Sequence, residues 1–339
     1  MIEKYGKDIR MSRLGRNIEK VMEYNNASIR NCERFFRADS RFDGKCRICG
    51  GTETSFLVKM NNQYEYYQCH QCGCVVLGNL PDVEEIYTDA DDTGNIKEYI
   101  DDSIFNARVE MITKPKVEFV LETANELGMN IESWLDIGCS GGELLFYIAK
   151  KYKNIQARGI ECDPFEVKFA KKKGLEVYEV FVDVKKNDEV IANMLRESSV
   201  VSFINTLEHV EHPQEYIDFF YENMKSGSLL VVEVPRYPSV ASFANLTNPS
   251  IVYRHITPPI HLQIFTEKAM DLLFEGKFEM LGKWGFGQGY TDLLVNAMVN
   301  AGLKENELYY KACSVANEVQ RVMDSNGLAD QMIYVARRK

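Results

Sequence analysis

The stretch LDIGCSGGELLFYIAK, residues 135–150, runs from an apolar segment through a glycine-rich turn into a helical pattern. Gly138 permits the positive φ of a tight turn, Gly142 permits a ligand to approach the backbone, and the following helix begins with free N–H groups. A strand, a turn and a helix in this order predict a ligand-binding edge of a parallel sheet. Because a glycine turn alone is a weak signal, its neighbours decide what it binds.

The next apolar segment ends in GIECDP, residues 159–164. Glu161 follows Gly138 by 23 residues and stands at a strand end, where a carboxylate accepts hydrogen bonds from both hydroxyls of a ribose. NAD would suit this geometry, but the G-x-G-x-x-G fingerprint is absent, and Asp136 inside the strand end is not a dinucleotide feature. The two segments therefore predict a nucleoside pocket at the carboxyl edge of the sheet.

Further short apolar runs surround this motif at 134–137, 157–160, 200–204 and 229–234, separated by helical patterns that begin with 117–127. This alternation predicts βαβ units and a doubly wound parallel α/β sheet. Later residues predict a helix over 266–274, two strands over 278–284 and 332–336, and a late helical insertion at about 288–328. No internal repeat or low-complexity tract is evident.

Two cysteine pairs precede the sheet, in CRICG (46–50) and CHQCG (69–73). The nineteen residues between the pairs suit two knuckles folded around one tetrahedral Zn2+, with Cys46, Cys49, Cys69 and Cys72 as ligands. Four thiolates leave no open position for substrate, so we expect a structural zinc ribbon over residues 46–80. His70 and Cys74 are possible substitute ligands, and iron would also suit a four-cysteine site.

Composition limits the remaining functions. The chain of 339 residues has a formal net charge of -10, which argues against nucleic acid as a partner. No secretory signal or long apolar run appears, so we expect a cytoplasmic protein without a membrane span. Residues 1–45 suggest a helical N-terminal segment, and residues 81–104 an acidic linker. The α/β domain would then occupy residues 105–339.

Several motifs resemble those of the class I S-adenosylmethionine (SAM)-dependent methyltransferases. LDIGCSGG (135–142) is similar to their first motif, with a serine where glycine is commoner, and VVSFINTLEHVEHP (200–213) and SLLVVEVP (228–235) resemble their fourth and fifth strands. The resemblance implies a seven-stranded Rossmann-like sheet whose last two strands form an antiparallel hairpin. It also implies SAM as the cofactor, held by Asp136, Gly138, Ser140, Gly142, Glu161, Asn205 and Thr206.

With its cysteine pairs, the chain is most similar to a subgroup with an N-terminal zinc ribbon, found among sugar-modifying enzymes of glycan and natural-product pathways. In sugar C-methyltransferases of this subgroup a Tyr-His-Glu-His stretch supplies the catalytic histidine. The corresponding residues here are Pro258, Pro259, Ile260 and His261, so only the last histidine is retained. The atom that is methylated, oxygen, nitrogen or carbon, therefore stays open.

A base is needed if the acceptor is a hydroxyl or an acidic carbon, and histidine is the usual base near neutral pH. His261 and His209 are the candidates, with His255 a weaker one. Each also has a structural interpretation: His261 bonded to backbone, and His209 with Glu208 capping a helix.

We expect a methyltransferase acting on a small polar acceptor, most simply a nucleotide-linked or glycan sugar, with the ribbon and the N-terminal helices helping to form the acceptor site. Two alternatives remain at this point. The ribbon could grip RNA or protein as the methyl acceptor, or the chain could be a scaffold that binds SAM without catalysis. The oligomeric state does not follow from the sequence.

Overall fold

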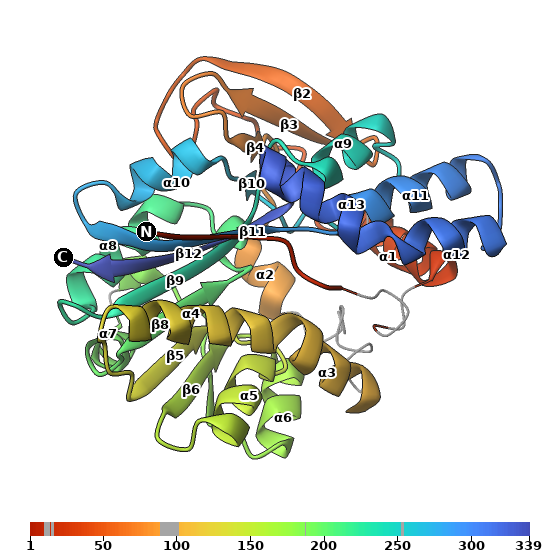
Figure 1. The fold of residues 1–339 in the computed structure, drawn as a ribbon. Helices are drawn as coiled ribbons and strands as arrows, with labels where there is room; N and C mark the ends of the chain where they lie inside the picture. Colours follow the sequence, from red (N-terminus) through yellow and green to blue (C-terminus); the bar gives the residue numbers. More distant parts are fainter. Residues whose placement is uncertain (10–13, 15–16, 89–101, 187, 252–253) are drawn as a thin grey trace.

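The computed structural model describes residues 1–9, 14, 17–88, 102–186, 188–251 and 254–339. These residues form an α/β fold with an eight-stranded main sheet and a separate four-stranded sheet (Figure 1). The main sheet has the strand order β1-β11-β12-β9-β8-β5-β6-β7. Most of the acidic linker predicted at 81–104 lies outside the described residues, since 89–101 are not among them.

The centre of the main sheet consists of five parallel strands: β5 (Ser133–Ile137), β6 (Gln156–Glu161), β7 (Val177–Glu179), β8 (Val200–Ile204) and β9 (Leu229–Pro235). The apolar runs predicted four of these strands, and β7 was not predicted. Helices α4 (Lys114–Glu126), α5 (Glu143–Lys151) and α6 (Pro164–Lys172) contribute to the core on one face. Helices α7 (Glu189–Arg196), α8 (Pro213–Asn223) and α10 (Glu267–Phe274) contribute to the core on the other. Burial on both faces explains why β8 and β9 are mostly apolar, whereas β6 and β7 also contain exposed polar residues.

The remaining strands of the main sheet differ in one respect from the prediction. β12 (Gln331–Arg338) lies antiparallel between β9 and β11 (Phe278–Phe286), as expected for the last two strands. However, β1 (Ile2–Tyr5) pairs in parallel with β11 and makes the sheet eight-stranded instead of seven-stranded, so residues 1–45 are not wholly helical. The four residues IEKY alternate between half-buried and exposed and contain no apolar run, which is why the sequence did not reveal this edge strand.

The second sheet forms the ribbon and consists of β2 (Thr54–Met60), β3 (Tyr64–Cys69), β4 (Val75–Leu77) and β10 (Gln263–Ile264), all antiparallel. Its fourth strand comes from the catalytic part of the chain, so the ribbon is not confined to residues 46–80. Leu77 N–H donates to Leu262 O over 2.8 Å, and Cys74 Sγ donates to Ile264 O over 3.1 Å. The ribbon is therefore joined to the main domain by backbone pairing.

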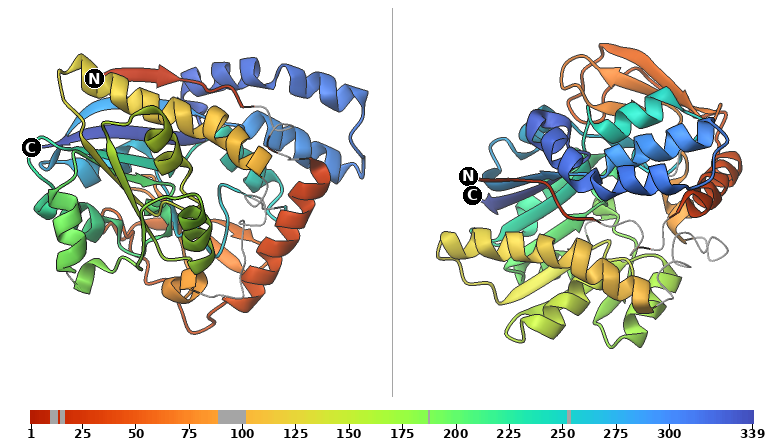
Figure 2. Two further views of the ribbon diagram at one scale, coloured as in Figure 1. Left: turned by 90° about the horizontal axis from the view of Figure 1, so that it is seen from below. Right: turned by 45° about the vertical axis from the view of Figure 1, so that its right-hand side comes forward.

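Helix α1 (Ile18–Arg34) lies at the end of the molecule beside the late helices (Figure 2). Ile18 N–H donates to Glu305 Oε1 over 3.0 Å, and Ser28 Oγ donates to Pro258 O over 3.3 Å, so α1 contacts both the late helices and the loop before β10. The other helices are α2 (Val83–Thr88), α3 (Asp102–Arg108), α9 (Val240–Thr247), α11 (Gly289–Asn300), α12 (Glu307–Ser314) and α13 (Ala316–Met323), with π-helical turns at Val109–Thr113 and Asp324–Leu328 and 3-10 turns at Val184–Lys186 and Leu207–His209. Within the described ranges, no helix combines the length and the apolar character needed to cross a bilayer.

Candidate active site

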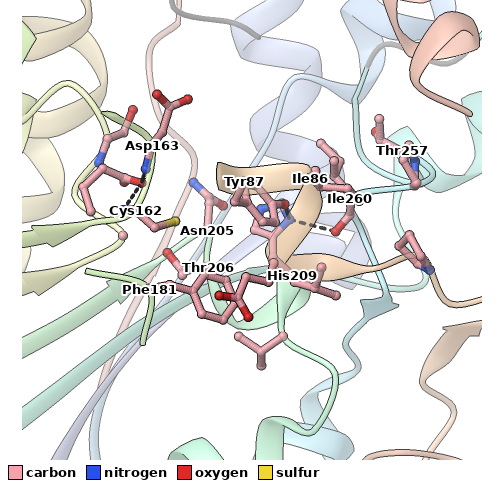
Figure 3. A pocket seen from close by; sticks show the side chains of 18 of the residues that line it. Ile86, Tyr87, Cys162, Asp163, Phe181, Asn205, Thr206, His209, Thr257 and Ile260 are labelled. Atoms are coloured by element: carbon pink, nitrogen blue, oxygen red, sulfur yellow. Dashed lines mark hydrogen bonds between the residues drawn. The ribbon is translucent and has the colours of Figure 1, made fainter. Parts of the chain in front are cut away.

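A cavity of about 1490 Å³ opens at the carboxyl ends of β5, β6 and β8. A site for a single ligand usually has roughly 300–1,000 Å³, so this cavity is large enough for two molecules. Figure 3 shows Cys162 and Asp163 on one side, His209 and Ile260 on the other, and Asn205 between them. Five of the seven residues predicted to bind the cofactor are among those that line it: Gly138, Ser140, Glu161, Asn205 and Thr206.

Asp136 and Gly142, the other two, are not among the lining residues. Asp136 is buried in β5 and accepts a hydrogen bond from Ser202 Oγ over 2.5 Å; burial raises its pKa to about 7. Gly142 has φ +81°, and a Cβ added to it would lie 2.5 Å from Leu175 Cδ1. Gly142 is thus required for the turn and for packing against the segment after α6, and its role in the approach of a ligand stays a prediction.

Glu161 organises the nucleoside end of the cavity. Its Oε2 accepts the backbone N–H of Ser140 over 2.8 Å, and its Oε1 accepts those of Cys162 and Asp163 over 2.7 and 2.9 Å. A carboxylate can accept about four hydrogen bonds, so three amide donors leave it able to accept one more, from a hydroxyl group. The Glu161 carboxylate lies where the resemblance to methyltransferases implies that a ribose binds. The residues of this end of the cavity therefore fit a nucleoside.

The floor of the cavity is formed where β8 ends. Asn205 has φ +49°, donates its N–H to Glu233 O over 2.9 Å, and donates from Nδ2 to Glu233 Oε1 over 3.3 Å. Glu233 in turn forms a buried ion pair with Lys116, Nζ to Oε2 2.6 Å. Thr206 packs against the glycine turn, because a Cβ added to Gly138 would lie 2.5 Å from Thr206 Oγ1. These contacts fix the position of the glycine turn at Gly138 relative to Asn205 and Thr206, which form the floor.

The opposite end of the cavity contains a cluster of Glu208, His209 and His261. His209 Nε2 lies 3.9 Å and His261 Nε2 lies 4.0 Å from Glu208 Oε1, and the two imidazole rings are 5.0 Å apart between centroids. His209 lines the cavity, whereas His261 lies behind it with 13% of its side chain exposed. The structure thus brings both predicted base candidates together with an acid.

Hydrogen bonds fix both imidazole rings through Nδ1. Nδ1 of His209 lies 2.8 Å from Ile260 O and 2.6 Å from the hydroxyl oxygen of Tyr87, and Nδ1 of His261 donates to His255 O. Neither Glu208 nor His209 makes a capping hydrogen bond in the described structure, so the helix-cap interpretation does not hold. Both side chains instead face the shared centre of the cluster.

Burial determines the charge of this cluster in the absence of any ligand. It lowers the pKa of His209 to about 4 and that of His261 well below its usual value, and it raises the pKa of Glu208 well above its usual range. Both imidazoles are therefore neutral near pH 7 and keep a lone pair on Nε2.

The three remaining histidines lie outside this cluster. His255 is buried with φ +72°, its Nε2 lies 3.0 Å from Ser239 Oγ, and burial lowers its pKa to about 3. His212 directly precedes α8 and lies 3.3 Å from Glu211, and His70 is exposed on the ribbon. His255 is not among the residues that line the cavity.

The cysteine pairs form two matching knuckles. Gly50 N–H donates to Cys46 O and Gly73 N–H donates to Cys69 O, over 2.8 and 2.9 Å, with φ of +71° and +76° at the two glycines. The four sulfur atoms lie within 4.8 Å of one another, with Cys46 to Cys72 and Cys49 to Cys69 both at 3.6 Å. Tetrahedral Zn2+ with bonds of 2.3 Å would place the sulfurs about 3.8 Å apart. The four residues therefore fit a structural zinc ion.

Helix α1 contributes a wall of the cavity, as expected for the N-terminal helices, through arginines that the sequence did not single out. Arg30 and Arg34 on α1 and Arg37 just after it line the acceptor end of the cavity. Arg37 also lies 3.9 Å from Asp82, at the start of the segment leading to α2. The spacing of these arginines was visible in the sequence, but only the packing of α1 against the loop before β10 places them at the cavity.

A doubly wound sheet with this strand order and a nucleoside pocket at the carboxyl ends of β5 and β6 is the architecture of a Rossmann-like methyltransferase. A family model described as a methyltransferase domain matches residues 105–277, and the chain belongs to this family. The protein is a SAM-dependent methyltransferase.

Solved structures with a similar fold include a SAM-dependent methyltransferase from Archaeoglobus fulgidus (18% sequence identity, covering 71% of this chain and 99% of that chain, TM-score 0.44). They also include a plantazolicin methyltransferase in complex with a triazolic desmethyl analogue and SAH (12% identity, 76% and 97%, TM-score 0.45). A third is coclaurine N-methyltransferase bound to N-methylheliamine and SAH (16% identity, 66% and 72%, TM-score 0.41). No curated protein matches the chain significantly.

Proposed function

We propose that the protein transfers the methyl group of SAM to a small polar acceptor, a nucleotide-linked or glycan sugar. The observation that carries this proposal is that one cavity joins the nucleoside end at Glu161 to an end lined by Arg30, Arg34 and Arg37. A cavity of about 1490 Å³ gives room for both the cofactor and a second extended ligand.

The arginine side chains support an acceptor that carries phosphate. Guanidinium groups bind phosphate oxygens through paired N–H donors, and Arg30 and Arg34 are one helical turn apart on α1. A sugar linked to a nucleoside diphosphate would place its phosphates there and its sugar between α1 and His209. This arrangement favours a nucleotide-linked sugar over an uncharged glycan.

Gly138, Ser140, Glu161, Asn205 and Thr206 would hold the cofactor, which supplies an activated methyl group when bound. Glu161 would accept a hydrogen bond from a ribose hydroxyl, while Asn205 and Thr206 form the floor beneath the reacting atoms. Because a sulfonium methyl needs mainly in-line placement of a nucleophile, the chief task of the acceptor side is to hold the sugar and remove its proton. In a site without further ligands, Nε2 of His209 or His261 would accept that proton.

The ribbon and α1 would act as the scaffold of the acceptor site. Tyr66 in β3 donates its hydroxyl to His261 O over 2.8 Å, and Cys32 Sγ in α1 donates to Pro258 O over 3.3 Å. The loop that carries Ile260 and His261 is thus held from both sides. We propose that zinc in the ribbon stabilises this loop and takes no part in methyl transfer.

Two measurements test the proposal in order. Calorimetric titration with S-adenosylhomocysteine (SAH) should give micromolar binding, and titration with NAD should give none. The protein is then incubated with SAM and a panel of nucleoside-diphosphate sugars, an RNA mixture and a peptide mixture, and released SAH is measured. Turnover with a sugar nucleotide supports the proposal, whereas turnover confined to RNA or peptide would replace the acceptor class. SAH binding without turnover on any acceptor would favour a scaffold.

A further inference from the structure

We propose that Glu208, His209 and His261 form a binding site for a divalent transition-metal ion at the acceptor end of the cavity, separate from the four-cysteine site. One oxygen of the acid and one nitrogen from each histidine lie within 4.8 Å of one another. Two imidazoles and one carboxylate are a ligand set found in catalytic zinc and non-haem iron sites. The site would therefore take Zn2+ or a related ion with open coordination positions.

The orientation of both imidazoles supports this assignment. Nδ1 of His209 faces Ile260 O at 2.8 Å, and Nδ1 of His261 faces His255 O, so each ring carries its proton on Nδ1. The unprotonated Nε2 atoms of the two rings then lie 3.9 and 4.0 Å from Glu208 Oε1. Histidines that bind metals characteristically donate their other ring N–H to a carbonyl or carboxylate, and both rings here have that second bond.

Glu208 provides an independent observation. It is 1% exposed, and neither carboxylate oxygen has a hydrogen-bond partner among the described residues. Burying a carboxylate without hydrogen-bond donors costs free energy. Its polar neighbours in the cluster are the Nε2 atoms of His209 and His261, which carry lone pairs and cannot donate. A cation would satisfy all three groups at once.

The distances are compatible with an ion after a small adjustment. Bonds of about 2.0–2.2 Å to one ion would place neighbouring ligand atoms about 3.0–3.5 Å apart. The observed separations from Glu208 Oε1 are 3.9 Å and 4.0 Å, and all three ligand atoms lie within 4.8 Å of one another, so side-chain shifts of about 1 Å would close the site. Three protein ligands leave at least one position open, and because His209 lines the cavity we place that position on the cavity side.

Binding of the ion does not depend on the proposed function, but its role does. An acceptor hydroxyl bound at the open position would have its pKa lowered by the ion, and its proton would pass to water. The two Nε2 lone pairs would then be engaged in coordination. The histidines would activate the acceptor through the metal, instead of accepting its proton directly.

The test is the number of zinc ions in the purified full-length protein. After expression with added zinc, we expect two zinc ions per chain by mass spectrometry of the metal. Glu208→Gln and His261→Gln should each contain one, and His212→Gln should contain two, because His212 also lies beside a carboxylate but on the surface. Brief treatment with EDTA should release one ion from the wild type, and calorimetry with ZnCl2 should then show one site.

That site should be weakened more than about 100-fold in Glu208→Gln. Thermal unfolding of each variant checks that it is folded, and Gln at position 208 keeps the shape of the side chain. One zinc ion in the wild type, with no ZnCl2 binding after EDTA treatment, would overturn the proposal, and so would two ions retained by Glu208→Gln. A protein with two ions that methylates no sugar nucleotide would keep this site and refute the proposed acceptor.

Discussion

The backbone N–H of Ser140 donates a hydrogen bond of 2.8 Å to Oε2 of Glu161. This bond joins the glycine turn after β5 to the end of β6, which are 21 residues apart in the chain. Ser140 itself has φ +50°, a conformation that side chains rarely adopt and that a charge-assisted hydrogen bond helps to hold. The nucleoside end of the cavity is therefore one hydrogen-bonded unit centred on a carboxylate.

Glu161→Ala should weaken binding of SAH about 10- to 100-fold, because the ribose loses its acceptor and the turn loses its anchor. Calorimetric titration measures the change. The matched control is Glu179→Ala, an exposed carboxylate that pairs in register with Glu161 on the neighbouring strand. Equal SAH affinity for wild type and Glu161→Ala would refute the assignment of the nucleoside end.

Asp136→Asn should change how stability depends on pH. The folded pKa of Asp136, about 7, lies above its ordinary value of 3.8, so the folded state binds more protons than the unfolded state between about pH 4 and pH 7. The contribution of Asp136 to the free energy of unfolding therefore falls as the pH rises through this window. About three pKa units correspond to about 4 kcal/mol.

Asparagine keeps the acceptor for Ser202 Oγ but cannot ionise. We expect Asp136→Asn to gain stability relative to the wild type as the pH rises from 4 to 7, with no further gain above pH 7. Urea unfolding at several pH values measures this difference. A constant difference between the two proteins over that range would show that Asp136 does not titrate there.

Cys69→Ser should lose the ion of the four-cysteine site and should lower the melting temperature at the same time, because binding free energy at a structural zinc site is folding free energy. Metal analysis and thermal unfolding on the same sample check this. Cys313→Ser, in α12 and away from the cluster, should change neither. Normal melting of Cys69→Ser with its full metal content would contradict the ribbon as a zinc site.

Replacing both Arg30 and Arg34 by alanine should raise the KM for a sugar nucleotide at least about tenfold, since each lost charged hydrogen bond to phosphate costs roughly 1.5–3 kcal/mol. The affinity for SAH should not change, because both residues line the acceptor end. Arg41→Ala, an exposed arginine that is not among the lining residues, serves as the control. Loss of SAH affinity in the double variant would indicate a general disturbance of the fold.

The main sheet and the cysteine cluster could be predicted because their signals are local. The central strands β8 and β9 are buried and mostly apolar, and two knuckles of identical spacing bring four thiols together. The sequence was less informative where a residue gains its role through tertiary contacts. Examples are β1, which contains two charged residues and joins the edge of the sheet, and Gly142, which packs against Leu175.

The acceptor end illustrates the same limit. His209 and His261 were predicted as separate candidates for the base, and their spacing of 52 residues gave no reason to expect them within reach of the same carboxylate. The structural reason is that Leu262 N–H donates to Glu208 O over 2.8 Å, which places the two segments side by side. Such a pairing depends on how loops pack, and no periodic pattern in the sequence records it.

The pairing of β4 with β10 has a consequence for the growing chain on the ribosome. Val76 pairs with Gln263, so 187 residues must be synthesised after the edge of the ribbon before its partner strand exists. At about 5–20 residues per second this interval lasts roughly 10–40 seconds. During that time the nascent ribbon exposes an unpaired strand edge, which promotes aggregation. Early capture of zinc by the cysteines would keep the nascent ribbon folded until the catalytic sheet arrives to complete it.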